Sequence, residues 1–329
     1  MPGIPLQVVP MSSLSGKSGE QGSAGVKRGG VASATGYPLV SVGIPVFNGE
    51  RFLSESIQSI LDQDYPNLEV IISDNGSTDS TPEILHGFSE RDDRIRLFTH
   101  AENRGAAWNF NFVFSRSQGG LFKWATHDDV CAPSFIRECV SALESRPDAV
   151  LAYPRASVID EHGSVIRDYE NHGFGCAVDR LARVRSMLRR ESGCFEICGV
   201  IRREALTATR MLGRYAGADR VLLFELGVVG PFIEVEKRLF FYRRHEAQSV
   251  SRNSDPRERS RWFDSQAPEG GVFPCWRVLR EHIGAIHRHW PREGRVRAYF
   301  LLLYWLRNHC RALTRDVMRG AWYIVRGRT

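Results

Sequence analysis

The sequence predicts an α/β fold built on a mostly parallel sheet flanked by helices, with a basic helical tail after it. Short apolar segments alternate with amphipathic segments from residue 39 to residue 144. This alternation is typical of βαβ units, in which right-handed crossover helices cover a parallel sheet. One apolar run, at 122–125, leads directly to the adjacent acids Asp128 and Asp129. We therefore expect a ligand site where this predicted strand ends.

Length, composition and charge limit the classes of protein to which this chain can belong. The chain has 329 residues, of which 42% are hydrophobic and 25% are charged, enough for one large domain and an appendage. Its net charge of +6 suits phosphorylated ligands, an anionic membrane surface or nucleic acid. Much of that excess belongs to the tail, where ten arginines and two acids follow residue 287. Seven scattered cysteines without a CxxC pair argue against a disulfide framework and a structural zinc site, and favour reduced thiols.

The chain divides into three predicted parts. Residues 1–37 are rich in Gly, Ser and Ala, and we expect a flexible leader there. Residues 38–245 carry the alternating pattern and should form the catalytic domain. Residues 246–329 should form a polar lid or linker followed by a basic amphipathic helix. No stretch has the apolar length of a signal peptide core or a membrane span, so we expect a cytoplasmic catalytic part.

The predicted elements follow one another at a regular pace. Val, Ile and Leu at alternating or continuous positions indicate strands, and apolar residues at helical spacing indicate helices. The predicted strands are 39–46, 68–72, 95–98, the run ending at 128, 149–154, 156–159, 232–236 and 239–242. The predicted helices are 50–63, 81–88, 106–114 and 133–144.

Polar loops follow three of the early strands. They lie at 73–79, at 102–105 and at Asp128–Asp129. Open α/β sheets bind ligands in the crevice outside the carboxyl ends of their strands. Adjacent acids repel each other, and a divalent cation bridged to phosphate oxygens relieves that repulsion. The alternative for the acid pair is a solvated turn before a helix that begins at Pro133.

Two common nucleotide-binding signatures are missing. No GxGxxG follows the first strand and no GxxxxGK[ST] occurs in the chain, which argues against a dinucleotide dehydrogenase and a P-loop enzyme. A phosphate in this site would instead be held by a metal on the carboxylates.

Four motifs carry a resemblance to a known family. VGIPVFN at 42–48, SDNGSTD at 73–79, NRG at 103–105 and HDD at 127–129 occur in this order and spacing. Together they resemble family 2 glycosyltransferases, which are inverting enzymes with the GT-A fold, a Rossmann-like sheet flanked by helices. The resemblance covers roughly residues 38–245 and is most specific in its first half.

The resemblance implies a set of residues for the donor nucleotide. They are Pro45, Phe47, Asn48, Asp74, Asn75, Arg104 and Asp128. Asp74 matches the acid that binds the base, Arg104 matches a basic residue near the diphosphate, and Phe47 stands where the family usually has Tyr. The alternatives are an Asx turn for Asp74, a solvated Arg104 and a Phe47 packed in the core.

The resemblance also implies a metal site. The family's usual Asp-x-Asp begins here with Thr126, so Asp128 is the acid expected to bind Mg²⁺ or Mn²⁺, with Asp129 beside it. His245 resembles a C-terminal histidine that reaches the metal in some GT-A enzymes. The alternative for His245 is a solvated side chain in a basic turn.

The predicted general base is Asp219. It lies in a segment that resembles the family's Glu-Asp motif at the start of a helix, with Ala218 in place of Glu. A carboxylate there would take the proton of the acceptor hydroxyl. The alternative is that Asp219 only stabilises the N-terminus of the helix.

The tail presents a repeating charge pattern. Arginines recur every fourth residue from Arg307 to Arg319, and the side chains expected to face away from them are Leu302, Leu306, Leu313 and Val317. Such a helix, with Trp305, Trp322 and Tyr323, can lie on an anionic membrane as a peripheral anchor or pack on the catalytic domain.

These observations predict transfer of a sugar from a nucleotide diphosphate donor to a hydroxyl acceptor, in cell-surface polysaccharide or glycolipid synthesis if the acceptor is lipid-linked. The alternative is a basic binding protein for membranes or nucleic acid with an inactive transferase-like domain. No nucleic acid partner is expected for the enzyme.

Overall fold

The computed structural model describes residues 36–169, 172–189, 193–246, 248, 256–266 and 273–326. The strands within these ranges are β1 Val40–Val46, β2 Leu68–Asp74, β3 Ile95–Thr99, β4 Leu121–Trp124, β5 Val130–Cys131, β6 Leu151–Ile159, β7 Val165–Asp168, β8 Val200–Arg202 and β9 Phe232–Arg243. The helices are α1 Leu53–Leu61, α2 Thr81–Ser89, α3 Ala106–Arg116, α4 Phe135–Ser145, α5 Arg180–Arg189, α6 Arg203–Thr207, α7 Ala218–Val229, α9 Pro256–Phe263, α10 Pro274–His289 and α11 Arg295–Arg326, with short 3₁₀ turns η1 Phe195–Cys198 and η2 Arg292–Gly294. Most of the predicted leader and parts of the predicted lid lie outside the described residues.

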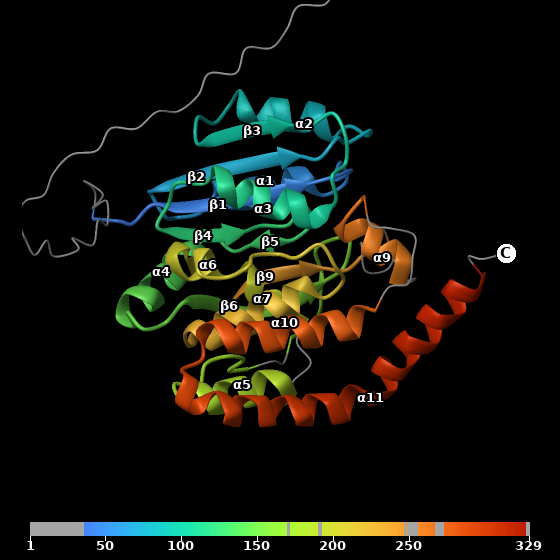
Figure 1. The fold of residues 1–329 in the computed structure, drawn as a ribbon. Helices are drawn as coiled ribbons and strands as arrows, with labels where there is room; N and C mark the ends of the chain where they lie inside the picture. The colour runs from blue at the N-terminus through green and yellow to red at the C-terminus, as the bar shows by residue number, and fades with distance from the viewer. Residues whose placement is uncertain are drawn as a thin grey trace, which may run out of the picture. The chain divides into compact units, whose positions relative to one another are not determined.

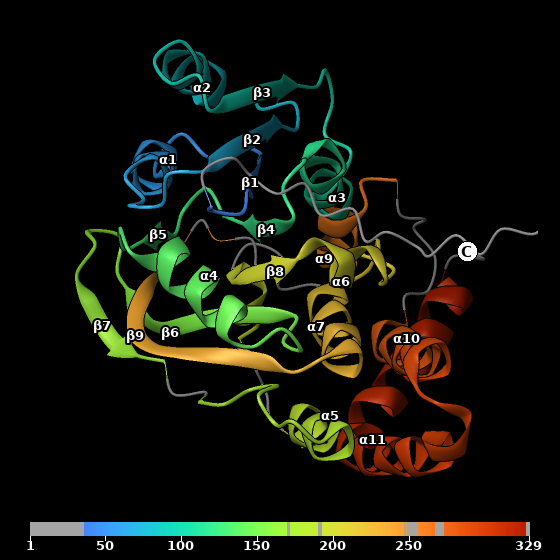
Figure 2. The same cartoon turned by 90° about the vertical axis from the view of Figure 1, so that its left-hand side faces the viewer.

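The strands form one sheet in the order β3-β2-β1-β4-β8-β6-β9-β5, with β7 paired to β6 (Figure 1). Strands β3, β2, β1 and β4 are parallel, as the sequence predicts. Helices α1 and α2 lie on one side of this parallel half, and α3 covers the other side (Figure 2). The carboxyl ends of four neighbouring strands therefore meet at one edge of the sheet.

The second half of the sheet is mixed. β8 is antiparallel to both β4 and β6, β9 is parallel to β6, and β5 is antiparallel to β9. The strands predicted at 149–154 and 156–159 form the single strand β6, and those predicted at 232–236 and 239–242 form the single strand β9. The pairing of β6 with β9 shifts in register near Arg155. β6 and β9 both end at the edge where β4 ends, so the sheet brings distant segments to one place.

The C-terminal helices pack against the catalytic domain. α10 lies between α7 and α11, and α5 contacts both α7 and α11 (Figures 1 and 2). Leu302 and Leu313 of the predicted inward side are buried in this contact. Trp305, which the membrane-contact alternative would place at the bilayer, is buried here as well. Val317 does not belong to that side, because its side chain is 48% exposed. Among the helices that the structure describes, none combines the length and the apolar character needed to cross a membrane.

A buried histidine lies in this helical layer. The ring of His282 in α10 packs against Phe224 of α7, 4.2 Å between centroids, and against Trp305 of α11, 5.6 Å away. Its Nδ1 is buried and has no hydrogen-bond partner. Burial, with a smaller contribution from His309, lowers the pKa of His282 to about 3. The C-terminal layer is therefore built around a neutral imidazole.

We expect His282 to make the fold sensitive to acid. A histidine whose pKa is lowered by folding stabilises the protein above its unfolded pKa of 6.5, and this contribution is lost as the pH falls toward the folded pKa. Between about pH 7 and about pH 5 the loss should be about 2 kcal/mol, at about 1.4 kcal/mol per pKa unit. His282→Phe should flatten the pH dependence of the unfolding free energy in urea, whereas His162→Gln, at an exposed position, should leave it unchanged. An unchanged slope in His282→Phe would contradict this account.

Candidate functional site

Two loops meet at the carboxyl ends of β1 and β2. The backbone N–H of Asn48 donates to Ser77 Oγ at 2.9 Å, and Asn48 Oδ1 accepts from the N–H of Thr78 at 2.9 Å. Asn48 has a φ of 51°, a left-handed conformation that asparagine tolerates better than most residues. Asn48 thus joins the two loops by its backbone and its side chain.

Residues Pro45 and Phe47 lie on either side of the end of β1. Pro45 is buried within the strand opposite Ser73, so it shapes the backbone of the site. Phe47 is 38% exposed at the edge of the sheet, where its ring can meet a ligand. The structure does not place Phe47 in the core, which was the alternative for this residue.

Asp74 is the last residue of β2 and Asn75 follows it, and both are almost fully buried. Asp74 Oδ1 accepts from the backbone N–H of Ser77, three residues on, at 3.1 Å, so one of its oxygens is engaged within its own loop. Asn75 Nδ2 donates to Asn103 Oδ1 at 2.9 Å, and Asn75 Oδ1 accepts from the N–H of Arg104 at 3.1 Å. Asn75 therefore holds the turn before α3 against the end of β2.

Arg104 lies at the rim of this turn. Its side chain is 48% exposed, and its Cζ lies 4.9 Å from the ring centroid of Trp108. His100 Nε2 lies 3.0 Å from Ser73 Oγ, and burial followed by the charge of Arg104 lowers the pKa of His100. Arg104 thus lies on Trp108, which also contacts the His100 ring with 4.8 Å between centroids, and its Nε lies 3.7 Å from Glu102 Oε1. Its half-exposed guanidinium remains accessible to an anion at this rim. Sequence reasoning did not single out Trp108 or His100.

The adjacent acids lie in a loop between β4 and β5, since β4 ends at Trp124 rather than at Asp128. Asp128 Oδ2 lies 3.2 Å from Nε2 of His245, which follows β9. The two side chains are 15% and 5% exposed. The fold therefore brings together a carboxylate and an imidazole that are 117 positions apart in the chain.

Asp129 has a different environment. Its Oδ1 accepts from the backbone N–H of Arg243 at 2.9 Å, and its Oδ2 accepts from the Thr126 hydroxyl. Both oxygens are engaged within the protein, so Asp129 supports the loop. Thr126, at the position where the family usually has an acid, also belongs to this support.

The two carboxyl groups have pKa values shifted in opposite directions. Burial raises the pKa of Asp128, but the charges of His127 and His245 and the hydrogen bond to His245 outweigh it, so the pKa is lowered. Burial and the neighbouring Asp128 charge raise the pKa of Asp129 well above its ordinary value. Asp128 is therefore the charged member of the pair.

A buried arginine supports the acid loop. Arg243 is 1% exposed, and its Nε donates to the carbonyl oxygen of Asp128 at 2.9 Å. Its Nη2 donates to Glu55 Oε2 at 2.6 Å, and its Nη1 donates to the carbonyl oxygen of Asp160 at 3.2 Å. The ring of Phe52 packs against this guanidinium and also against the His245 ring, with 4.7 Å between the two ring centroids.

The Asp128–His245 pair fits a divalent cation that takes its other ligands from phosphate. No group of three or more His, Cys, Asp or Glu that could hold a metal is found in the described residues. However, the 3.2 Å between Asp128 Oδ2 and His245 Nε2 is close to the separation of about 3.0 Å between neighbouring ligands of an octahedral cation with bonds of about 2.1 Å. Mg²⁺ sites commonly use one or two carboxylates together with substrate phosphates, and Asp128 supplies such a carboxylate here.

Asp219 is the second residue of α7. Its Oδ1 accepts from the N–H of Arg220 at 2.9 Å, and its side chain is half-buried. It lies beside the Cys194 thiol, whose pKa is raised well above its ordinary value by burial and by the neighbouring Asp219 charge. Cys194 precedes η1 and β8, and β8 begins opposite Lys123 near the end of β4. Asp219 is thus on the edge that carries Asp128, and no described contact joins the two acids directly.

The family-model comparison matches residues 41–209, more than half of the chain, to "Glycosyl transferase family 2". The chain belongs to glycosyltransferase family 2. This confirms the family that the four motifs predict, and it covers the donor-side loops described above.

Relatives of the family 2 chain include an uncharacterized glycosyltransferase of Rickettsia felis, 35% identical over 133 residues, 40% of this chain and 21% of the relative. Glycosyltransferase GlyG of Streptococcus pneumoniae is 31% identical over 156 residues, 47% of this chain and 50% of the relative. The chain therefore spans between about a fifth and a half of the length of these curated relatives.

Solved structures share the fold of the family 2 chain. S. aureus TarS 1–349 in complex with UDP-GlcNAc has a TM-score of 0.63 at 14% identity, over 82% of this chain and 72% of that one. The mannosyltransferase PcManGT of Pyrobaculum calidifontis in complex with GDP-Man and Mn²⁺ has a TM-score of 0.50 at 18% identity, over 86% and 74%. These likenesses confirm the GT-A fold predicted from the sequence.

Arg243→Met should loosen the acid loop of the family 2 domain. It removes the four hydrogen bonds of a buried guanidinium, three to backbone carbonyl oxygens of the two loops and one to the exposed Glu55 carboxylate. We therefore expect a loss of about 2 to 4 kcal/mol in the free energy of unfolding. Arg244→Met changes the adjacent arginine, which is exposed, and serves as the matched control. Chemical unfolding in urea measures both, and equal stability of the two variants would contradict the supporting role of Arg243.

Proposed function

We propose that this family 2 glycosyltransferase transfers a sugar, with inversion, from a nucleoside diphosphate donor to a hydroxyl acceptor. The observation that carries the proposal is the Asp128–His245 pair, which lies at the edge of the sheet where β1 and β2 also end. Structural relatives in complex with UDP-GlcNAc and with GDP-Man and Mn²⁺ support a nucleotide-sugar donor.

The donor would lie across the ends of β1, β2 and β4. Phe47 would pack on the base, Asp74 would accept a hydrogen bond from it, and Arg104 would meet the diphosphate. Pro45, Asn48 and Asn75 would act through the loops they shape and join.

The residues that would hold Mg²⁺ or Mn²⁺ are Asp128 and His245. Asp129 would stabilise their loop through its hydrogen bonds to Thr126 and Arg243. When bound, the cation neutralises the negative charge that develops on the leaving diphosphate. His245 is kept in place by Phe52, and the carbonyl of Asp128 is held by Arg243.

Asp219 would act as general base on the other side of the sugar. The acceptor oxygen attacks the anomeric carbon as the bond to the diphosphate oxygen breaks, and Asp219 takes the proton of the acceptor hydroxyl.

The segment after β9 is proposed to cover the donor. A Cβ on Gly105 would lie 2.7 Å from the carbonyl oxygen of Phe263 and 2.9 Å from Cα of Asp264, so the end of α9 packs directly on the turn that carries Arg104. This close approach supports a cover over the donor side, within a lid that we propose at 246–272 after a catalytic domain at 38–245.

We also propose that the acceptor is lipid-linked and that the enzyme works in the cytoplasm at the inner face of the membrane, in polysaccharide or glycolipid synthesis. The arginine-rich C-terminal helix supports this setting. A binding protein with an inactive transferase-like domain has less support, because the family match and the ordered acid pair both favour an enzyme.

Asp219→Asn and Asp128→Asn should lower the turnover of nucleotide-sugar hydrolysis or transfer by different routes. Removing a general base costs about 10²-fold to 10⁴-fold in rate, so Asp219→Asn should lower kcat while it keeps donor affinity. Asp128→Asn should weaken metal-dependent donor binding as well.

The assay uses UDP, GDP, dTDP and CDP sugars with Mg²⁺ or Mn²⁺, and Asp148→Asn as a control at an exposed acid. Full turnover in Asp219→Asn would exclude it as the base, and no turnover of any donor by the wild-type chain would contradict the proposed reaction.

A further inference from the structure

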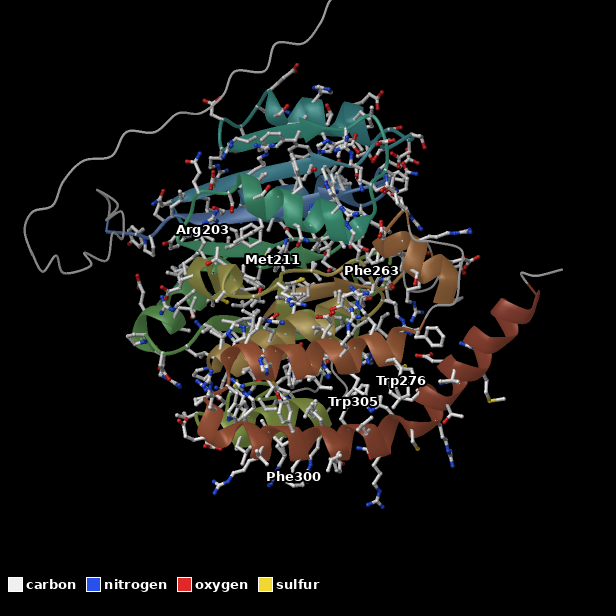
Figure 3. All side chains as sticks on the ribbon, viewed as in Figure 1. Arg203, Met211, Phe263, Trp276, Phe300 and Trp305 are labelled. Atoms are coloured by element: carbon white, nitrogen blue, oxygen red, sulfur yellow. The ribbon has the colours of Figure 1, made fainter. Side chains whose placement is uncertain are left out.

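The outward side of α11 exposes a row of large apolar side chains. Val296, Phe300 and Leu303 are 63%, 65% and 56% exposed, and their spacing places them on one stripe of the helix. Figure 3 shows Phe300 pointing away from the body of the protein, while Trp305 points toward α10. The inward side of α11 already buries its own apolar residues, so this row is additional to the packing of the helix. Exposed apolar patches of this kind mark interaction sites.

The charges around the row are positive. α11 contains seven arginines and one acid, Asp316, which is buried and accepts from the N–H of Cys275 at 2.7 Å. Arg297, Arg307 and Arg311 are exposed along the same half of the helix as the apolar row. A partner for this side must therefore be both apolar and negatively charged.

Helix α5 contributes to the same surface, although it lies more than a hundred residues earlier in the sequence. α5 lies beside α11 in both views (Figures 1 and 2). The guanidinium of Arg189 lies 5.0 Å over the ring of Tyr304, which is 41% exposed. A hollow on α5 is lined by Ala182, Arg185, Ser186 and Arg189. Two guanidinium groups and a hydroxyl suit a phosphate group.

We propose that these two helices form a docking face for an anionic lipid bilayer. The docking face consists of Val296, Phe300, Leu303, Tyr304, Arg307 and Arg311 of α11 with Arg185 and Arg189 of α5. The apolar row enters the boundary between headgroups and acyl chains, and the arginines contact lipid phosphates while their stems lie along it. The apolar row would have no partner on a nucleic acid, and the arginines would have none on an uncharged apolar surface.

The docking face is connected to the proposed base by direct helix packing. α5 and α10 both pack on α7, whose first turn carries Asp219, and α11 packs on α5 and α10. Phe224 of α7 and Leu279 of α10 are buried in the same apolar cluster as Leu302 of α11. Docking would therefore set the orientation of α7 relative to the bilayer, which suits a lipid-linked acceptor. The link to a lipid-linked acceptor depends on the function proposed above, whereas the docking of the two helices on a bilayer does not.

Co-sedimentation of the full chain with vesicles tests the docking face. The probes are phosphatidylcholine vesicles with and without phosphatidylglycerol. The double variant Phe300→Ser, Leu303→Ser should reduce binding to the anionic vesicles about tenfold or more, since it removes the buried apolar contact. Arg185→Gln with Arg189→Gln should reduce binding and weaken its dependence on salt.

The matched control is Val165→Ser, Ile166→Ser, an apolar pair on β7 that is 58% and 56% exposed. It should bind vesicles as the wild-type chain does. Absence of wild-type binding to anionic vesicles, equal binding to neutral vesicles, an equal loss in the β7 control, or complete displacement by inorganic phosphate would each overturn the proposal. Self-association through the face, abolished by the same Phe300 and Leu303 changes in the absence of vesicles, would assign it to a second copy of the chain instead.

Donor binding without vesicles separates this proposal from the proposed function. The Phe300, Leu303 double variant should bind nucleotide sugars as the wild-type chain does. If the wild-type chain binds vesicles but binds no nucleotide sugar, the proposed function is contradicted and the docking face is still supported.

Discussion

A contact between the end of β9 and the loop after β4 supports the candidate site. Arg243 reaches from β9 to the carbonyl of Asp128, and its own backbone N–H donates to the carboxyl group of Asp129. Two residues later His245 lies against Asp128. One strand end therefore positions both members of the proposed metal pair, and it can do so only because the sheet places β9 beside β6 and β5. The mixed half of the sheet thus supplies His245, the second member of the proposed pair.

The first half of the domain could be predicted from the sequence because each of its strands lies next in sequence to the loop that it presents. Each of its strands is an apolar run followed within a few residues by the polar loop that it presents, so the order of runs and loops is enough to assign Asp74 and Asp128 to one edge. The second half depends on pairing between distant segments. Register between β6 and β9, or between β4 and β8, leaves no signal in a single sequence because many apolar segments are equally suitable partners.

The residues that sequence reasoning missed are those that act through distant contacts. Arg243 lies in a run of basic residues that indicates a solvated turn, yet it is the buried one. Its position directly after the predicted strand 239–242 was the one available signal, and the structure shows that β9 extends to include it. For α11 the pattern left packing and membrane contact open. The structure shows why the pattern was ambiguous: apolar side chains occupy two sides of the helix, one buried against α10 and α5 and one exposed.

The account depends on the Asp128–His245 pair acting as the protein's share of a metal site that a nucleoside diphosphate completes. Calorimetric titration of UDP and GDP into the wild-type chain, with Mn²⁺ or with EDTA, tests this directly, with His245→Gln and exposed His162→Gln as the compared variants. The account predicts that one of the nucleotides binds at least about tenfold more tightly with Mn²⁺, corresponding to about 1.4 kcal/mol, and that His245→Gln alone loses this difference. Equal affinity with Mn²⁺ and with EDTA, or an unchanged metal effect in His245→Gln, would contradict it.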